Sequence, residues 1–182
     1  LCVEGAKVCA ADINLEGAVR TAAEAGDNAF AVYADIADEA SVQKAVDAAV
    51  AKLGGLDGAH LNAADLRVIF DDSDAAAIDL GVFDRTIAVN LRGPLLCTRA
   101  VLPHLLRNKA SSIVYTSSGS AQGAEPTRPC YAMSKAGLNA LMRHVATRWG
   151  KEGLTANVLA PGFTLTGEMK TQMEANSGEA KK

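Results

Sequence analysis

The sequence lacks the features on which several classes of function depend. Its 18 Lys and Arg residues are scattered among 21 Asp and Glu, for a net charge of −3. It therefore has no basic stripe of the kind that neutralises a phosphate backbone. No apolar run approaches the roughly 18 residues that a membrane span requires, and no signal-like start is visible. We expect neither nucleic acid nor a membrane among the partners.

Cysteine and histidine are few and far apart. Cys2, Cys9, Cys97 and Cys130 form no CxxC pair, and the 3 histidines do not cluster with them. A zinc site or a redox pair would thus lack its ligands, and we expect no bound metal. Isolated cysteines are typical of free thiols in a reducing compartment, which favours a cytoplasmic protein. The first residue is Leu1 rather than Met, so the pattern of cysteines does not exclude a targeting segment upstream.

The composition is that of a globular protein. Hydrophobic residues make up 49% of the 182 residues and charged residues 21%, which is unlike the polar composition of disordered chains. A chain of this length normally forms one domain with a sizeable core, so we expect residues 1–182 to be a single domain. The polar segment 167–182 is expected to be mobile.

Short apolar runs alternate with longer segments of helical period, which predicts an α/β fold with βαβ units and a parallel sheet. The predicted strands are residues 7–11, 28–33, 56–62, 112–116 and 155–160, and the predicted helices are 15–25, 39–53 after an N-cap at Asp38, 80–108 and 131–149. Gly93 and Pro94 lie in the middle of the third helix, where we expect a kink or a break because proline lacks an amide donor. The acidic segment 65–79 is predicted to be a loop.

One helical segment carries a tyrosine and a lysine four residues apart. This spacing places the side chains of Tyr131 and Lys135 on one face of the helix, within reach of a common ligand. A neighbouring ammonium favours the phenolate form of a tyrosine, which makes Tyr131 a candidate proton donor and acceptor. Such pairs also arise by chance on amphipathic helices, so the assignment needs further residues.

Ser118 is such a residue, because it lies at the carboxyl end of a predicted strand. Ligands of open α/β sheets bind outside these ends, and a hydroxyl there can donate a hydrogen bond to a substrate carbonyl. Ser117, Ser118 and Ser120 are also compatible with ordinary turn serines. The segment contains no G-x-S-x-G motif and no histidine that would act as the base, which argues against a serine hydrolase.

Further motifs occur in the same order as in a known family. They are Asp12, Asp35-Ile36, Leu61-Asn62-Ala63-Ala64, Asn90, Ser118, Tyr131-Ala132-Met133-Ser134-Lys135 and Pro161-Gly162-Phe163-Thr164-Leu165-Thr166. Each motif alone is weak, but together they extend over nearly the whole chain. On these motifs the sequence resembles the short-chain dehydrogenase/reductases, which have a doubly wound, Rossmann-like parallel sheet in a three-layer sandwich.

The resemblance implies a catalytic tetrad. Tyr131 would be the general acid/base, Lys135 the ammonium that supports it and binds ribose hydroxyls, Ser118 the group that polarises the carbonyl, and Asn90 the holder of a proton-relay water. The implied reaction is hydride transfer between NAD and a secondary alcohol or ketone. The implied assembly is a homodimer or homotetramer that packs through the helices of Asn90 and Tyr131.

The same resemblance implies the cofactor contacts. Asp12 resembles the acidic residue that binds both hydroxyls of the adenine ribose, and its carboxylate would repel a 2′-phosphate, which favours NAD over NADP. Asp35 and Ile36 resemble the adenine-edge contacts, although Asp35 also fits a helix cap or a turn. The other implied cofactor contacts are Asn62, Ala63, Ala64, Tyr131, Lys135, Pro161, Gly162, Thr164 and Thr166. Ala64 replaces the glycine that lets the backbone of the family's Asn-Asn-Ala-Gly turn approach the cofactor.

One family feature is missing from the sequence. The family opens with a strand and a glycine-rich turn that binds the pyrophosphate, and the eleven residues before Asp12 leave no room for them. The missing strand belongs between the predicted strands 7–11 and 56–62, and the family's last strand should follow Met173. We therefore interpret the chain as a fragment with an incomplete sheet. A non-catalytic nucleotide-binding or regulatory relative stays an alternative, as does a flavodoxin-like signalling domain, which would not explain the Tyr-Lys pair.

Overall fold

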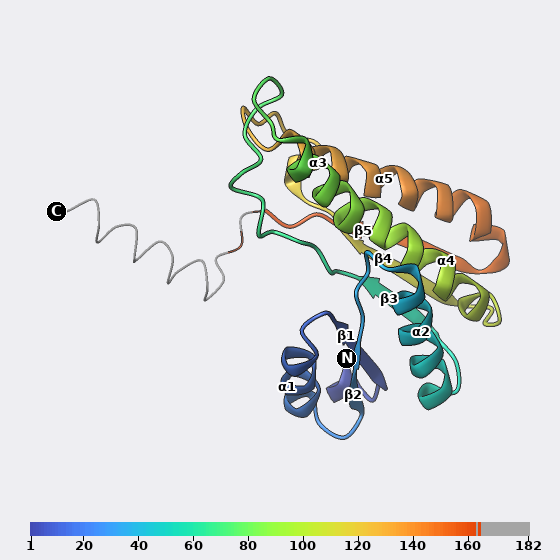
Figure 1. Cartoon of the computed structure of the whole chain (residues 1–182). Coiled ribbons are helices and arrows are strands. Elements are labelled where there is room, and N and C mark those ends of the chain that lie inside the picture. The colour runs from blue at the N-terminus through green and yellow to red at the C-terminus, as the bar shows by residue number, and fades with distance from the viewer. Residues whose placement is uncertain (163, 165–182) are drawn as a thin grey trace.

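Five parallel strands and the helices between them make up the fold (Figure 1). The computed structural model describes residues 1–162 and 164. Segment 167–182, for which we predicted mobility, lies outside the described residues, as does Thr166.

Each predicted strand is present, and each predicted helix is found close to its expected bounds. The strands are β1 (Val8–Asp12), β2 (Ala29–Tyr33), β3 (Gly58–Leu61), β4 (Ser111–Thr116) and β5 (Leu154–Leu159). The α-helices are α1 (Leu15–Ala25), α2 (Glu39–Leu53), α3 (Leu80–Ile87), α4 (Gly93–Leu105) and α5 (Pro129–Trp149). Short 3-10 turns lie at η1 (Cys2–Glu4), η3 (Gly119–Ala121) and η4 (Gly150–Glu152).

Local side chains fix the ends of the first two long helices. Asn14 Oδ1 accepts a hydrogen bond from Gly17 N–H at 3.0 Å, and Asp38 Oδ1 accepts one from Ser41 N–H at 2.9 Å. These are N-caps, which satisfy amides that have no partner within the helix. Gly54 ends α2 at φ 82°, in the left-handed region that favours glycine. The N-cap predicted at Asp38 is therefore confirmed.

The strands form two separate parallel sheets, β1-β2 and β3-β4-β5. Pairing is interrupted between β1 and β3, at the place where we predicted an incomplete sheet. Figure 1 shows β1 and β2 lying between α1 and α2, whereas α4 and α5 pack against the second sheet and α3 packs against α5. Helices on both sides of parallel strands are the doubly wound arrangement that the sequence predicted.

The hydrophobic core belongs to the second sheet. Its most deeply buried members are Leu105, Ile113, Tyr115, Leu138, Val145 and Leu154. They come from α4, β4, α5 and β5, and β4 alternates buried with half-buried residues. Neither β1 nor β2 contains a buried residue.

The helix predicted for residues 80–108 does not break at Gly93 and Pro94. It continues from α3 through a π-helical turn, η2 (Ala88–Arg92), into α4. Gly93 N–H donates to the carbonyl of Ala88, five residues earlier. Pro94 thus falls in the first turn of α4, where its missing N–H needs no partner. Of the kink or break that we expected, the break is absent because the wider turn accommodates the proline, and the helix is irregular there instead. Such turns are frequent at functional sites.

Candidate active site

Tyr131 and Lys135 lie on consecutive turns of α5. Lys135 Nζ is 5.6 Å from the centroid of the Tyr131 ring, so the two side chains share one face of the helix as predicted. Tyr131 is half-buried, whereas Lys135 is only 3% exposed. The pair is therefore accessible at the phenol and enclosed at the ammonium.

The surroundings of Lys135 connect α5 to the end of β4. Lys135 Nζ donates to the carbonyl of Thr116 at 2.8 Å, and the carbonyl of Lys135 accepts a hydrogen bond from Ser117 Oγ at 3.1 Å. Burial lowers the pKa of Lys135 to about 8, because desolvation disfavours the ammonium. An ammonium has three donors and Thr116 accepts one of them, so Lys135 can also donate to the hydroxyls of a bound ribose.

The three serines after β4 differ in their surroundings. Ser117 is buried and its hydroxyl contacts α5, whereas Ser120 Oγ donates to the Glu125 carboxylate. Ser118 is half-buried, and its Oγ accepts a hydrogen bond from Ser120 N–H at 3.2 Å as the cap of η3, which packs against α5. Ser118 thus has the turn role that the sequence allowed, and its hydroxyl can still donate to a ligand.

The segment after β5 returns to this turn. Gly119 N–H donates to the carbonyl of Pro161 at 3.1 Å, which brings the exit of β5 beside Ser118. Thr164 Oγ1 donates to the carbonyl of Gly162 at 3.3 Å. Pro161 therefore lies beside the Ser118 turn, and Gly162 and Thr164 follow Pro161 along the chain. The fourth residue predicted for this cofactor segment, Thr166, lies outside the described residues.

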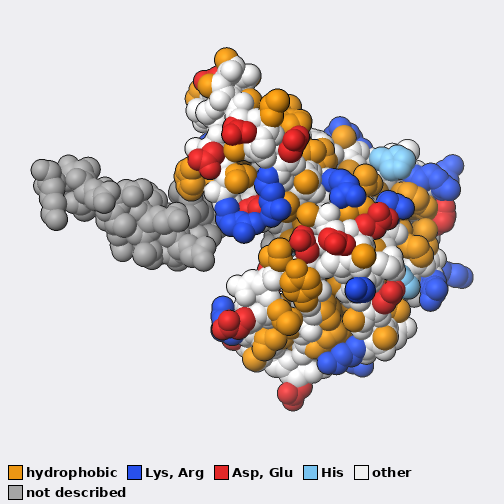
Figure 2. All heavy atoms as spheres, in the orientation of Figure 1, with side chains coloured by type: hydrophobic (Ala, Val, Ile, Leu, Met, Phe, Trp, Pro, Cys, Tyr) orange, Lys and Arg blue, Asp and Glu red, His pale blue; other side chains and the backbone are white. Residues whose placement is uncertain are grey.

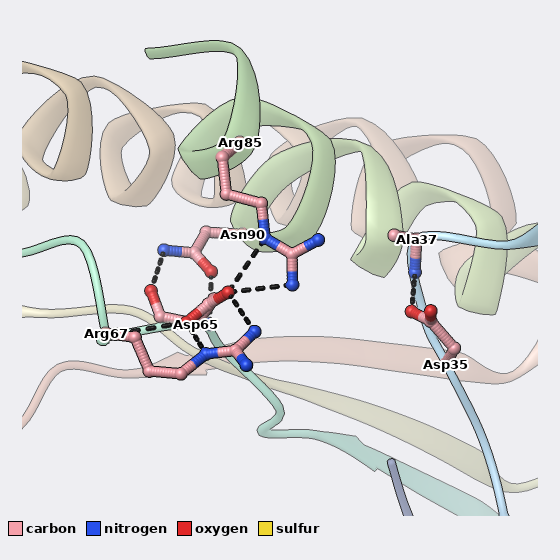
Figure 3. Close-up of polar contacts among 6 residues, drawn as sticks. All are labelled: Asp35, Ala37, Asp65, Arg67, Arg85 and Asn90. Carbon is pink, nitrogen blue, oxygen red and sulfur yellow. Dashed lines mark hydrogen bonds and ion pairs between the residues drawn. The ribbon is translucent and has the colours of Figure 1, made fainter. Parts of the chain in front are cut away.

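Asn90 lies in the π-helical turn and is 1% exposed. Its Oδ1 accepts a hydrogen bond from Asp65 N–H at 2.7 Å, and its Nδ2 donates to the carbonyl of Asp65 at 3.2 Å (Figure 3). This pair of bonds joins η2 to the segment that leaves the Asn62–Ala64 turn. The amide of Asn90 therefore holds backbone, and its predicted role toward a relay water stays a prediction.

Asp65 itself is the centre of a charged cluster that the sequence analysis missed (Figure 3). Its buried carboxylate accepts hydrogen bonds from Arg67 Nε at 2.9 Å, Arg67 Nη2 at 2.7 Å and Arg85 Nε at 2.8 Å. The hydrogen bonds from Arg67, with those from Arg85, hold the pKa of Asp65 well below its usual range although burial opposes this. Arg67 lies two residues after Asp65 in the sequence and could have been predicted as its partner, whereas the contact with Arg85 depends on the tertiary fold.

The residues predicted for the adenine end follow β1 and β2. Asp12 is exposed, and its Oδ1 accepts a hydrogen bond from Asn14 N–H at 2.8 Å. Asp35 Oδ1 accepts one from Ala37 N–H at 2.9 Å, which is the turn role that we left open for it (Figure 3). Ile36 packs against α4, because a Cβ built at Gly93 would lie 2.8 Å from Ile36 Cδ1.

Asn62 lies between the ends of β3 and β4. Its Oδ1 accepts a hydrogen bond from Thr116 Oγ1 at 2.9 Å, and His60 Nε2 lies 2.9 Å from the same hydroxyl. The predicted site residues Asp12, Asn62, Ala63, Ala64, Ser118, Pro161 and Gly162 thus end or follow β1, β3, β4 and β5. The carboxyl ends of parallel strands are where open α/β sheets bind ligands, and a carboxylate and an ammonium there suit the ribose hydroxyls of a dinucleotide.

The described residues form neither a metal-binding cluster nor a membrane-spanning helix. Within residues 1–162 and 164, no group of three or more His, Cys, Asp and Glu side chains is arranged to hold a metal ion. In the same part of the chain, no helix is both long and apolar enough to cross a membrane.

Comparison with known proteins agrees with this geometry. A family profile described as enoyl-(acyl carrier protein) reductase matches residues 1–181. A probable short-chain type dehydrogenase/reductase of Bradyrhizobium diazoefficiens is 34% identical over 140 residues, which are 77% of this chain and 50% of that protein. The chain belongs to the short-chain dehydrogenase/reductase family. The flavodoxin-like alternative was therefore wrong.

Solved structures of family members have the same fold. The 3-ketoacyl-(acyl-carrier-protein) reductase of Brucella melitensis complexed with NADH matches with a TM-score of 0.86 and 32% identity over 93% of this chain and 70% of that one. The gluconate 5-dehydrogenase of Burkholderia cenocepacia in complex with NADP and tartrate matches with a TM-score of 0.84 and 28% identity over 96% of this chain and 68% of that one. The predicted Rossmann-like fold is confirmed. This chain spans 50% to 70% of the length of the curated relatives.

Proposed function

We propose that the protein is an oxidoreductase that transfers a hydride between NAD(H) and a secondary alcohol or ketone. The observation that carries the proposal is the arrangement of α5 on β4. Lys135 Nζ lies 5.6 Å from the Tyr131 ring and donates to the end of β4, directly before the Ser117-Ser118 turn. A phenol, an ammonium and a hydroxyl at one sheet edge are the groups that proton transfer to and from a carbinol oxygen needs.

The four tetrad residues have distinct roles in this reaction. A bound nicotinamide would supply the hydride acceptor for oxidation and the hydride donor for reduction. In oxidation, Tyr131 Oη takes the proton of the substrate hydroxyl, and Lys135, on the next turn of α5, binds ribose hydroxyls. Ser118 Oγ donates a hydrogen bond to the same oxygen and stabilises its developing charge. Asn90 would hold the water that carries the proton away, through the part of its amide that the backbone of Asp65 leaves free.

We assign the cofactor preference to Asp12. The Asp12 carboxylate would accept hydrogen bonds from both hydroxyls of the adenine ribose and would repel a 2′-phosphate, so NAD is favoured over NADP. Its exposed place at the end of β1 supports this role. The remaining cofactor contacts in this proposal are Asp35, Ile36, Asn62, Ala63, Ala64, Pro161, Gly162, Thr164 and Thr166.

The assembly and location are also proposals. We infer a homodimer or homotetramer that packs through α3, α4 and α5. Leu95 on α4 and Met133 on α5, which are 44% and 49% exposed, support this surface, and Figure 2 shows apolar side chains among charged ones on the face in view. The four free cysteines support a cytoplasmic location.

The test is turnover by the full-length protein. NADH binding is followed by the enhancement of its fluorescence, and a panel of secondary alcohols, polyols and their ketones is assayed for NADH formation or loss. Tyr131→Phe should lower kcat by about 10²-fold to 10⁴-fold while NADH still binds, because the general acid/base is lost. Ser118→Ala should also lower kcat, whereas the neighbouring Ser120→Ala should not.

Two results would change the assignment. A wild-type protein that binds NADH but turns over nothing in the panel would favour the non-catalytic, nucleotide-binding alternative. Equal activity of wild type and Tyr131→Phe would contradict the mechanism.

A further inference from the structure

The first turn of α5 is capped by a residue from a distant part of the chain. The N-cap residue Arg128 makes no side-chain cap, and Pro129 has no amide to donate. Asp72 takes over this role: its Oδ2 accepts a hydrogen bond from Tyr131 N–H at 2.8 Å, and its Oδ1 accepts one from Cys130 N–H at 3.2 Å. A single carboxylate therefore satisfies both free amides next to the catalytic tyrosine.

The backbone around Asp72 holds the same turn. Arg128 N–H donates to the carbonyl of Asp72 at 2.9 Å and to that of Ser73 at 3.1 Å. Arg128 has a φ of 67°, a conformation that non-glycine residues rarely adopt, so these contacts fix an unfavourable entry into α5. Asp72 is 2% exposed, which makes it one of the most buried charged side chains that the structure describes.

The carboxylate of Asp72 also acts on Cys130. Burial, and after it the hydrogen bond and charge of Asp72, raise the pKa of the Cys130 thiol to about 11. A negative charge beside the first turn of a helix is favourable, because it faces the positive end of the helix dipole.

Loop 65–79 therefore contacts two of the four proposed tetrad residues. At its start, the backbone of Asp65 is bonded to the amide of Asn90, and in its middle Asp72 is bonded to the amide of Tyr131. We propose that Asp72 is a positioning residue, which sets the place of the Tyr131 phenol relative to the Asn90 turn by holding the first turn of α5 to this loop. The inference rests on the proposed role of Tyr131 as the general acid/base.

The physical reason is the geometry of proton transfer. A general acid/base must lie within hydrogen-bond distance of the substrate oxygen, and a displacement of about 1 Å can cost up to about 10²-fold in rate. The Tyr131 side chain starts from the residue whose amide Asp72 holds. A loosened turn would thus move the phenol without altering the strands that bind the cofactor.

Substitutions at two adjacent aspartates test the inference in the full-length protein. Asp72→Ala removes both acceptors and should lower kcat by about 10-fold to 100-fold, and Asp72→Asn, which keeps one acceptor oxygen, by about 3-fold to 10-fold. The KM for NAD should change less than about twofold, and the primary deuterium isotope effect on kcat should rise because hydride transfer becomes slower. Asp71→Asn, at an exposed neighbour in the same loop, should behave like wild type.

The isotope effect separates positioning from a loss of folded protein. If Asp72→Ala and Asp72→Asn lower kcat only in proportion to the unfolded fraction, with an unchanged isotope effect and KM, the inference is overturned. Wild-type kcat in both variants would overturn it as well, and the proposed function would stand.

If no substrate turns over, the proposed function fails, and hydrogen exchange then tests the role of Asp72 as the cap of α5 by itself. The amides of Cys130 and Tyr131 should exchange at least about tenfold faster in Asp72→Ala than in wild type, while amides in the middle of α5 keep their rates. Unchanged exchange at both amides would contradict the role of Asp72.

Discussion

The two sheets of this molecule contain similar apolar strands but differ in packing. One half comprises β3, β4, β5 and α3, α4, α5, and we call it the catalytic half because it contains the residues to which we assign the proposed proton transfer. In it, Ile113 and Tyr115 of β4 are 0% exposed. In the N-terminal half, which comprises β1, β2, α1 and α2, the strand residues are half-buried or exposed. The proton-transfer residues that we propose belong to the densely packed half. Asp12 and Asp35 lie in the other half at the carboxyl ends of β1 and β2, which we call the open edge.

The two sets of proposed residues also need different surroundings. Exclusion of water lowers the pKa of a lysine, and burial among the elements of the catalytic half has this effect on Lys135. A carboxylate that binds ribose hydroxyls needs no such environment, and Asp12 is exposed at the end of β1. Substitutions in the catalytic half should therefore change the free energy of unfolding. Substitutions at the open edge should change the preference between NAD and NADP.

The largest effect is expected at a glycine of the catalytic half. Gly153 has a φ of 93°, and a Cβ there would overlap the carbonyl oxygen of Lys109. Gly153→Ala should lower the free energy of unfolding by about 3 kcal/mol or more, because strain and overlap add. Gly54→Ala, at a φ of 82° with nothing within 4 Å of its Cβ, should cost only about 1 kcal/mol. Urea denaturation measures both, and equal losses would contradict the role of the overlap.

Core truncation should separate the halves next. Leu138 on α5 is 1% exposed, and Leu138→Ala should lower the free energy of unfolding by about 3 kcal/mol because it leaves a cavity. Leu15 on α1 is 43% exposed, and Leu15→Ala should cost less than about 1 kcal/mol. Thermal or urea unfolding distinguishes the two. A larger loss for Leu15→Ala would reverse the comparison.

Lys135 should make stability depend on pH. Its pKa is about 8 in the folded chain and near its usual 10.5 when unfolded, so the unfolded state binds more protons between these values. The free energy of unfolding of wild type should therefore rise, relative to Lys135→Met, by about 2 kcal/mol as the pH increases from 8 to 10.5. The difference between the two proteins removes the opposing contribution of the cysteines. A constant difference over this range would show that Lys135 keeps its ordinary pKa.

The smallest effect is expected at the open edge. Asp12→Asn should raise the ratio of kcat/KM for NADP to that for NAD by about tenfold, because the repulsion of a 2′-phosphate is removed, with little change in stability. Asp27→Asn, at an exposed turn before β2, is the control. Steady-state kinetics with both cofactors gives the ratio. An unchanged ratio in Asp12→Asn would place the cofactor discrimination elsewhere.

Local signals explain why most of the fold was predictable. The ends of α1 and α2 depend on Asn14, Asp38 and Gly54, which act on amides and carbonyls within a few residues. The alternation in β4 and the Tyr131-Lys135 spacing are likewise properties of short segments. The order of the strand-end motifs then indicated which residues would gather at one edge of the sheet.

The features that escaped prediction depend on distant partners. The bonds of Asp72 to α5 join residues 58 and 59 positions apart, and no local pattern marks an aspartate in an acidic loop as their acceptor. The contact of Asp65 with Arg85 crosses from the loop to α3. Gly93 and Pro94 indicated that the helix is irregular at this place, but they did not indicate the π-helical hydrogen bond that spans five residues.

Isotope transfer tests whether the protein transfers a hydride to a carbonyl carbon with Tyr131 as the proton donor. The full-length protein is given a ketone that it reduces and NADH that carries deuterium at both positions on C4 of the nicotinamide. The alcohol is then analysed by mass spectrometry and NMR. The account predicts one deuterium on the carbinol carbon, with the hydroxyl proton from solvent, and loss of this product in Tyr131→Phe. An alcohol without cofactor deuterium on that carbon would contradict it.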